Sequence, residues 1–325
     1  LTKSKIGCNA FLGGISKNYN TNLLLSPSEY IVAEADEYDR SFLNLYPYSS
    51  IITSIDADHL EIYGTHDEII KAFNLFTKQI RPNGVLIYKK NLPINTLELI
   101  KINSFTYSLN DDADFFAFDI RNDKGGQLFN LKTPDKIIEN LWLALPGKMN
   151  IENAVAASAL ALLVGIEENE LREGLSTFQG VKRRFEYHIK KDDFVYIDDY
   201  AHHPEEIKAC IESARSIYSK KKITGVFQPH LFTRTRDFAD EFAKSLSMFD
   251  EVILLDIYPA REEPINNVSS EIIFDKITCN KKYLCNKNDL LDLLKKLEPE
   301  VLITMGAGDI DRMVEPIVKI FEKNN

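Results

Sequence analysis

The chain has 325 residues, of which 44% are hydrophobic and 27% are charged, and its formal net charge is -10. These values are typical of a soluble globular protein with two domains, and an acidic chain without a long basic stripe is a poor candidate for binding nucleic acid or anionic membranes. No apolar run approaches the roughly 20 residues of a membrane span, and the four cysteines show no CxxC spacing, so we expect reduced thiols and a cytoplasmic location.

The first part of the chain alternates between predicted strands and helices. EYIVAEAD (29–36) and SSIITSID (49–56) are β-branched segments that predict buried parallel strands. Residues 66–80 have helical spacing, and NGVLIYKK (83–90) is the next predicted strand. This alternation predicts a doubly wound sheet that binds ligands at the carboxyl ends of its strands.

The middle of the chain has a different pattern. Residues 104–145 contain four apolar segments separated by turn residues, which predicts antiparallel strands. Residues 150–165 are Ala-rich and end at Gly165, which predicts a helix.

The strand–helix alternation resumes in the last part of the chain, after residue 180. We place a domain boundary near Gly180, which gives domains of residues 1–180 and 181–325. Helices are expected near 204–218, 234–248, 287–297 and 309–322. The helices lie between or after the expected strands, which are 194–200, 222–228, 250–258 and 300–306.

Acidic residues and a histidine follow the first two predicted strands. Glu34 and Asp36 follow the first strand, and the segment Asp56–His59 follows the second. If these strands were adjacent and parallel, Glu34 and His59 would share one crevice, where a carboxylate and an imidazole suit a divalent cation such as Mg²⁺. The alternative is that the acids cap loops and that His59 binds a backbone carbonyl.

Two further polar pairs have both a functional and a structural interpretation. Asn150 and Asn153 lie three apart at a helix start, where asparagine is usually a cap but could also recognise a purine edge. Arg183 and Arg184 lie at the predicted hinge, where guanidinium groups could bind phosphate. A solvated basic turn explains the arginine pair equally well.

The strand ends of the second domain carry the densest set of chemical groups. So many ionisable side chains at neighbouring strand ends are hard to explain by packing alone. A Gly-rich turn before the last helix adds backbone N–H groups that can meet an anion. The residues are Asp198, Asp199, Tyr200, His202 and His203 after the first strand, His230, Arg234 and Arg236 after the second, and Gly306–Gly308 in the turn.

The segments VAEADEYDRSF, SIDADHLEIYG, LPGKMNIENA, GVKRRFE, DDYAHHPEEI, FQPHLFTRTRDF and MGAGDIDRM together resemble the Mur ligase family. The resemblance runs through nearly the whole chain in order. It implies an α/β fold: part of a doubly wound P-loop-type ATPase domain with an antiparallel subsheet, followed by a Rossmann-like C-terminal domain.

The resemblance implies an ATP-dependent ligation. ATP phosphorylates a carboxylate to give an acyl phosphate, an amine attacks it, and the products are an amide, ADP and phosphate. Within the family the motifs are most similar to the branch that joins L-alanine to UDP-N-acetylmuramate in peptidoglycan precursor synthesis. The implied cofactors are therefore ATP and Mg²⁺, and the sequence leaves the oligomeric state open.

The resemblance also implies roles for single residues. Glu34 and His59 match Mg²⁺ ligands, with Asp58 as a supporting carboxylate. Asn150, Asn153, Arg184 and Asp199 match the ATP-binding positions. The positions that match substrate-binding residues are Tyr200, His202, His230, Arg234 and Gly306, of which His202 and Arg234 are the expected catalytic pair.

The sequence departs from the family pattern at several places. Asn74 stands where related ligases often have a carbamylated lysine, and Leu231 stands where some have an arginine. The sequence contains no GxxxxGK[ST] segment like the family's phosphate loop GTHGKTT. We therefore expect an N-terminally truncated fragment that is inactive or nearly so, since phosphoryl transfer depends on positioning and charge neutralisation.

Three other functions remain open at this point. A murein-peptide recycling ligase would attach a whole tripeptide and shares the EADEYD and AHHP-like motifs. A non-catalytic nucleotide- or peptide-binding module would explain the missing phosphate loop. A metallohydrolase built on DADH and HH is the least favoured. The sequence contains no GxSxG, HExxH or catalytic cysteine pattern.

Overall fold

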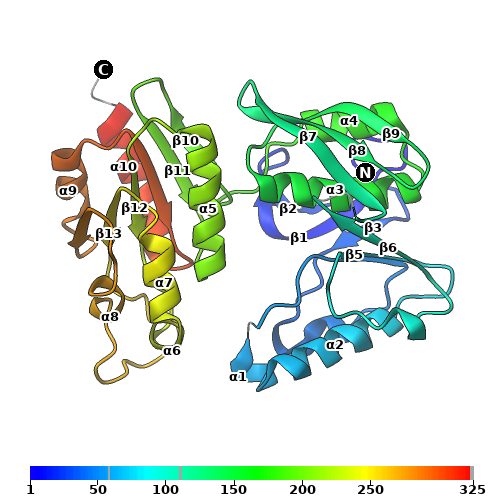
Figure 1. The fold of residues 1–325 in the computed structure, drawn as a ribbon, viewed down its shortest axis with the longest axis horizontal. Helices are drawn as coiled ribbons and strands as arrows, with labels where there is room; N and C mark the ends of the chain where they lie inside the picture. The colour runs from blue at the N-terminus through cyan, green and yellow to red at the C-terminus, as the bar shows by residue number, and fades with distance from the viewer. Residues whose placement is uncertain (58, 110–111, 323–325) are drawn as a thin grey trace. The chain divides into compact units, whose positions relative to one another are not determined.

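The computed structural model describes residues 1–57, 59–109 and 112–322 (Figure 1). The chain is an α/β protein that divides into two compact units, Leu1–Gln179 and Gly180–Asn325. This division lies one residue from the predicted boundary. The predicted Mg²⁺-supporting residue Asp58 lies outside the described residues. Within the described part of the chain, no helix is long and apolar enough to cross a membrane.

The first unit is built on a mixed six-stranded sheet with the order β4-β5-β6-β7-β8-β9. Neighbouring strands from β4 to β7 are parallel, and β7, β8 and β9 pair antiparallel. The strands are β4 (Ser49–Ile52), β5 (Val85–Lys89), β6 (Asn103–Ser108), β7 (Phe115–Asp123), β8 (Gly126–Lys132) and β9 (Ile137–Leu143).

Helices cover both faces of this sheet. Successive residues of β5 point to opposite faces, so Ile87 packs with Ile151 of α3 (Lys148–Leu163) while Leu86 packs with Phe76 of α2 (His66–Lys78). Helix α4 (Glu168–Ser176) adds Leu171 to the α3 side. The short elements η1 (Tyr38–Asn44), α1 (Leu60–Tyr63) and η2 (Thr96–Glu98) complete the unit.

A separate three-stranded sheet has the order β2-β1-β3, with β1 (Asn9–Ser16), β2 (Thr21–Leu24) and β3 (Ile31–Ala33). The prediction of β3 as a buried strand is wrong, because β3 lies at the edge of this small sheet and its three residues are exposed. The crevice proposed for Glu34 and His59 required β3 and β4 to be adjacent. They belong to different sheets, since β3 pairs with β1 and β4 pairs with β5.

The expected antiparallel pairing is correct for β7 to β9 but wrong for β6. Strand β6 runs parallel to β5 on one side and, over two positions, to β7 on the other. Residues 90–102 between β5 and β6 are long enough for a crossover between parallel strands, whereas a hairpin would need only a short turn.

The second unit contains a six-stranded sheet with the order β10-β11-β15-β12-β13-β14. All neighbouring pairs are parallel except β10 and β11. The four predicted strands are present, and β10 and β14 were not predicted. The strands are β10 (Glu186–Lys190), β11 (Val195–Asp199), β12 (Ile223–Phe227), β13 (Glu251–Leu254), β14 (Lys281–Leu284) and β15 (Val301–Met305).

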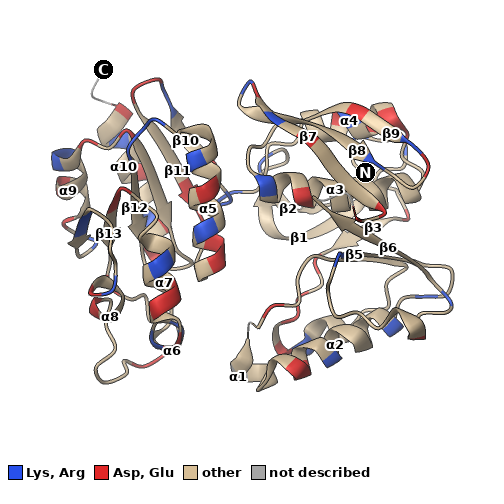
Figure 2. Ribbon diagram, in the orientation of Figure 1, with Lys and Arg blue, Asp and Glu red and all other residues tan. Residues whose placement is uncertain are grey.

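Helices sandwich the second sheet. One face packs against α5 (Pro204–Ile217), α7 (Ala239–Leu246) and α8 (Glu271–Phe274), and the other against α9 (Leu290–Leu297) and α10 (Val314–Glu322). The helix α6 (Phe232–Asp237) and the turn η3 (Asp309–Met313) follow the ends of β12 and β15. Lys/Arg and Asp/Glu residues are interspersed along α5 rather than segregated by sign (Figure 2).

The strand order brings the chemistry-bearing loops together. β15 lies between β11 and β12, and all three are parallel, so their carboxyl ends meet at one edge of the sheet. The segments that follow these ends are the three that the sequence singled out. Such an edge is the usual ligand position in an open α/β sheet.

Candidate active site

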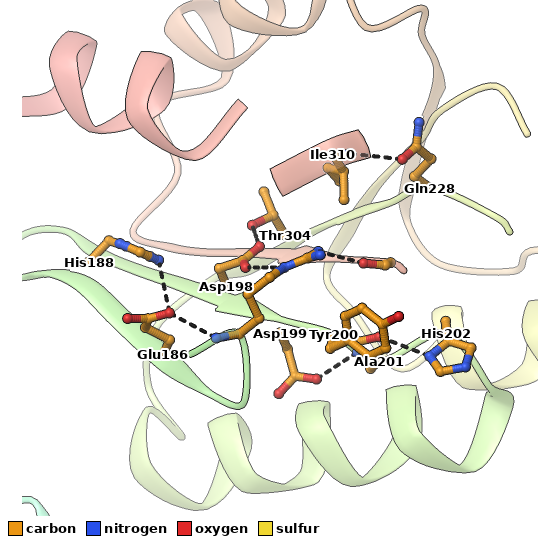
Figure 3. Close-up of polar contacts among 12 residues, drawn as sticks. Glu186, His188, Asp198, Asp199, Tyr200, Ala201, His202, Gln228, Thr304 and Ile310 are labelled. Carbon is orange, nitrogen blue, oxygen red and sulfur yellow. Dashed lines mark hydrogen bonds and ion pairs between the residues drawn. The ribbon is translucent and has the colours of Figure 1, made fainter. Parts of the chain in front are cut away.

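A buried ion pair forms the base of this edge. The Asp198 carboxylate is fully buried, and its Oδ2 lies 3.1 Å from Nε of Arg183. Thr304 donates its hydroxyl to Oδ1 of Asp198 at 2.6 Å, and Arg183 also donates to the Gly306 carbonyl at 2.6 Å. Figure 3 shows Asp198 next to Thr304 at the centre of these contacts. Arg183 therefore ties β11 to the turn that follows β15.

Asp199 fixes the two loops on either side of it. Its Oδ2 accepts the Phe185 N–H and its Oδ1 accepts the Ala201 N–H, both at 2.7 Å. Burial raises the pKa of Asp199 to about 6, although the two N–H donors and Arg184 act in the opposite direction. Burial likewise raises the pKa of Asp198, against the effects of Thr304 and Arg183.

Tyr200 lies beneath both hinge arginines. The guanidinium carbons of Arg183 and Arg184 are 5.1 and 5.5 Å from its ring centroid, within cation–π range. Arg183 is committed to Asp198, whereas the side chain of Arg184 is 53% exposed and lies 3.3 Å from Glu206. The structure thus separates a structural arginine from one that is available to a ligand.

His202 lies beside the Tyr200 ring, with centroids 5.1 Å apart (Figure 3). Its Nδ1 is 3.0 Å from the Tyr200 carbonyl and 3.2 Å from Oε2 of Glu206. Burial lowers the pKa of His202, and the charge of Arg234 acts in the same direction. The ring is therefore held in place and largely neutral at pH 7.

His230 approaches the same point from the end of β12. Its ring centroid is 6.2 Å from that of His202, and its ring stacks on that of Tyr258 with centroids 5.9 Å apart. Burial lowers the pKa of His230 to about 4, helped by His202 and Arg234. Within the described residues its buried Nδ1 has no hydrogen-bond partner. Three of the predicted residues, His202, His230 and Arg234, are thus brought together.

The glycine turn passes tightly over Gln228. Gly306 has φ 142°, and a Cβ there would lie 2.7 Å from the Gln228 carbonyl oxygen. A Cβ on Gly308 would lie 2.5 Å from Oε1 of Gln228 and 2.7 Å from Cβ of Tyr258. Gln228 in turn accepts the Ile310 N–H at 2.9 Å. Glycine is required at both positions for this close approach.

The predicted metal ligands lie in the first unit, on two different sheet edges. The exposed Glu34 carboxylate lies across β1, where a Cβ on Gly13 would meet its Oε2 at 1.8 Å. His59 lies with its Nε2 3.8 Å from Oε1 of Glu37, and its ring meets the edge of Tyr38 at 5.2 Å. The structure therefore pairs His59 with Glu37.

The predicted donor set is sparse, since the structure pairs His59 with Glu37 rather than with Glu34. In the described part of the chain, no group of three or more His, Cys, Asp or Glu side chains is arranged to hold a metal. Mg²⁺ keeps several waters and takes few protein ligands, so one exposed carboxylate and one imidazole are compatible with it. Glu37 is placed to orient the His59 ring. Asp36 accepts the Tyr38 N–H at 2.9 Å and so shapes the loop.

The predicted adenine-binding asparagines occupy the first turns of α3. Asn150 donates to the Pro146 carbonyl at 2.6 Å, and Asn153 is exposed. Asn74, which was expected to stand where related ligases often have a carbamylated lysine, donates to the Ile70 and Pro93 carbonyls at 2.9 and 3.0 Å. Asn74 therefore has a structural role in joining α2 to the following loop.

Several residues of the site were not predicted. Glu206 was expected only as part of a helix, Thr304 and Gln228 only as parts of strands, and Tyr258 only as the last residue of a strand. A local signal existed for Glu206, because it lies three residues after the helix cap His203, which is the spacing of a capping box. No local pattern indicated the others, since their partners are distant in the sequence.

Family comparisons identify the fold. The Mur ligase middle domain matches residues 3–161, and the Mur ligase glutamate ligase domain matches residues 183–308. The chain belongs to the Mur ligase family. Each unit of this Mur ligase thus matches one domain of the family. The predicted fold class, with its antiparallel subsheet and Rossmann-like second unit, is confirmed.

Individual relatives of this Mur ligase are similar over nearly all of its length. A UDP-N-acetylmuramate–L-alanine ligase of Parabacteroides distasonis is 51% identical over 324 residues, which are 99% of this chain and 70% of the relative. The Flavobacterium johnsoniae ligase of the same name is 44% identical, over 100% of this chain and 70% of its own.

Solved structures agree with the fold. The crystal structure of the UDP-N-acetylmuramate-alanine ligase from Thermotoga maritima matches with a TM-score of 0.81 and 25% identity, over 99% of this chain and 70% of that one. A murein peptide ligase from Psychrobacter arcticus matches with a TM-score of 0.63 and 19% identity, over 96% and 71%. At that identity the second match supports the fold alone.

Proposed function

We propose that this chain belongs to a cytoplasmic enzyme that joins L-alanine to UDP-N-acetylmuramate at the cost of ATP. The observation that carries the proposal is the 51% identity, over 99% of the chain, to a ligase of that name. The convergence of His202, His230 and Arg234 at one sheet edge supports it, because the residues that resemble substrate-binding positions are grouped in space.

The proposed reaction has two steps. The substrate carboxylate attacks the γ-phosphorus of ATP, which gives an acyl phosphate and ADP. The amino group of alanine then attacks the acyl carbon, loses a proton, and expels inorganic phosphate as the amide forms. A carboxylate is a poor electrophile, so the phosphate is needed as a leaving group, and cationic side chains stabilise the charge on the transferring oxygens.

The nucleotide contacts are assigned to four residues. Asn150 and Asn153 offer side-chain amides to the adenine edge, and the half-exposed Arg184 offers a guanidinium fork to phosphate oxygens. Asp199 acts by fixing the loops that carry Arg184 and His202, because both of its oxygens already accept backbone N–H groups.

Binding and deprotonation of the amino acid are assigned to His202 and Arg234, which follow the ends of β11 and β12. His202, neutral and held by its Nδ1, accepts the proton of the incoming ammonium group, and Arg234 binds a carboxylate or the developing phosphate charge. Tyr200, His230 and Gly306 shape the surrounding surface. Glu34 and His59 would hold Mg²⁺, which supplies charge neutralisation at the phosphate oxygens when bound.

The test is an assay of ADP release with L-alanine and UDP-N-acetylmuramate, using the product of the complete reading frame that encodes this chain. We expect ADP release that depends on both substrates. Residues 1–325 assayed in parallel should bind nucleotide with little turnover, because the sequence contains no phosphate loop. Alanine-dependent turnover by residues 1–325 at the same rate would refute that second expectation.

The alternative functions give different results in the same assay. A murein-peptide recycling ligase would use the tripeptide in preference to L-alanine. A nucleotide-binding module would bind ATP but release no ADP with any amino acid or peptide. Either result would overturn the proposed alanine ligase.

A further inference from the structure

The Glu206 carboxylate joins three parts of the candidate site. Its Oε2 accepts the backbone N–H groups of His202 at 2.9 Å and His203 at 3.2 Å, and it also lies 3.2 Å from Nδ1 of His202. Its Oε1 lies 3.3 Å from Nη1 of Arg184. One side chain in the first turn of α5 thus contacts both the histidine loop and the hinge arginine.

These contacts determine where His202 carries its proton. Nδ1 faces the Tyr200 carbonyl oxygen at 3.0 Å and the Glu206 carboxylate at 3.2 Å, and both are acceptors. Burial alone would raise the pKa of Glu206, but His202, its N–H and Arg184 lower it, so the group is a carboxylate at neutral pH. A nitrogen that faces two acceptors must be the donor, so Nδ1 carries the hydrogen.

The opposite ring nitrogen is then the basic one. In a neutral imidazole with hydrogen on Nδ1, the lone pair is on Nε2, and among the described residues Nε2 of His202 has no hydrogen-bond partner. The ring is neutral because its burial and the charges of Arg234 and Arg184 outweigh the charge of Glu206.

We propose that Glu206 is a positioning residue that fixes His202 as the Nδ1–H tautomer, so that Nε2 is the atom that accepts the proton of the incoming amine. This inference rests on the proposed ligase function. The ammonium group of the amino acid gives one proton to Nε2 and becomes an amine with a lone pair for attack. The imidazolium that forms is stabilised by the Glu206 carboxylate until its proton leaves to solvent.

The tautomer can be measured directly on the 325-residue chain without any activity. Long-range ¹H–¹⁵N NMR distinguishes protonated from unprotonated imidazole nitrogens, and the six histidines can be assigned by single His→Phe variants. We expect His202 to show a protonated Nδ1 and an unprotonated Nε2 above its titration. A protonated Nε2 with a bare Nδ1 would overturn the proposal, whatever the enzyme's substrate.

Variants of Glu206 separate charge from hydrogen bonding. Glu206→Gln keeps an acceptor oxygen but removes the charge, so the Nδ1–H form should persist while the His202 titration moves to lower pH. Glu206→Ala removes both and leaves the Tyr200 carbonyl as the remaining acceptor at Nδ1, so the population of the Nδ1–H form should fall below that in Glu206→Gln. The matched control is Glu205→Gln, since Glu205 is adjacent on α5 and its side chain is 73% exposed. An equal effect of the two Gln variants on His202 would contradict the proposal.

The kinetic prediction uses the product of the complete reading frame. Glu206→Gln should lower kcat for alanine-dependent turnover on the order of tenfold, short of the roughly 10²–10⁴ that a general base supplies, and should leave KM for ATP nearly unchanged. Unchanged circular dichroism would show that the variant folds. A rise in KM for ATP with unchanged kcat would show that Glu206 acts on the nucleotide through Arg184. That result would refute its role through His202.

Discussion

The Asp198 carboxylate, with no exposed surface, lies 3.1 Å from Nε of Arg183, whose side chain is 21% exposed. This pair joins the end of β11 to the loop that precedes β10, and Arg183 extends the connection to Gly306 after β15. Because a buried carboxylate without its partner keeps its full desolvation cost, the pair should control the stability of the second unit.

We therefore predict that Arg183→Ala destabilises the second unit by about 3 kcal/mol, since it leaves Asp198 with only the Thr304 hydroxyl. Urea unfolding followed by circular dichroism measures the change. The single tryptophan, Trp142, lies in the first unit, so its fluorescence reports that unit separately and should not change.

Arg184→Ala is the matched control for this experiment. Its side chain is 53% exposed and its ion pair with Glu206 lies at the surface, so the loss should stay below about 1 kcal/mol. Equal destabilisation by the two alanine variants would contradict the distinction between the Arg183 pair with buried Asp198 and the surface pair of Arg184.

A second prediction concerns pH and the buried Asp199. Its pKa is raised from 3.8 to about 6 in the folded chain, so between these values the folded state binds more protons than the unfolded state. The contribution of Asp199 to stability is therefore fully present below pH 3.8 and is lost as the pH rises through about 6. Above that pH its contribution is constant.

The measurement is urea unfolding of the native chain and of Asp199→Asn at several values between pH 4 and pH 7, with the window set by the pKa values of 3.8 and about 6. The native chain should lose stability relative to the variant as the pH rises through this window. A difference that is independent of pH would show that the Asp199 pKa is not raised. Trp142 fluorescence again identifies the transition of the first unit.

The architecture of the second unit could be predicted because its strands are short apolar segments that alternate with long helices. Strand β14 was missed, since its sequence KKYL is polar and half-exposed at the sheet edge. In the first unit the alternation identified β3, β4 and β5 as strands but not which of them pair. Strand pairing depends on contacts that no local pattern contains, so the sequence did not show that β3 and β4 belong to different sheets.

The candidate site was predictable as a set of loops but not as a set of contacts. Strand-end positions indicated His202, His230 and Arg234 because parallel strands end at one edge. The role of Glu206 was missed because it depends on the path of the hinge loop, where Arg183 and Phe185 have φ of 62° and 48°. Hydrophobic periodicity does not specify which residues adopt a left-handed backbone conformation.

A third prediction tests the metal assignment through Gly13. Gly13→Ala would place a Cβ 1.8 Å from Oε2 of Glu34, so the exposed carboxylate must move away from its position across β1. Because a flexible side chain can move cheaply, stability should change by less than about 1 kcal/mol. The gain in nucleotide affinity that Mg²⁺ provides should fall, as measured by calorimetry with ADP in the presence and absence of Mg²⁺.

Glu34→Gln and the double variant complete this test. If Glu34 holds Mg²⁺, Glu34→Gln should also remove the gain in ADP affinity that Mg²⁺ provides. Adding Gly13→Ala to Glu34→Gln should then cause no further loss, because both changes act on one ligand. Additive losses would show that Gly13→Ala acts through some other part of the sheet. Full retention of the Mg²⁺ effect in Glu34→Gln would exclude Glu34 as a ligand.

The last prediction separates the two asparagines at the start of α3. Asn153 is exposed, whereas Asn150 donates to the Pro146 carbonyl at 2.6 Å. Asn153→Ala should therefore leave stability unchanged and weaken ADP binding by about 1 kcal/mol, roughly fivefold, through the loss of one hydrogen bond to adenine.

Asn150→Ala should lower both stability and affinity. Calorimetry with ADP and GDP provides the measurement, since the loss of a contact to the adenine edge must reduce the preference for ADP over GDP. An equal loss of affinity for both nucleotides would place Asn153 away from the base.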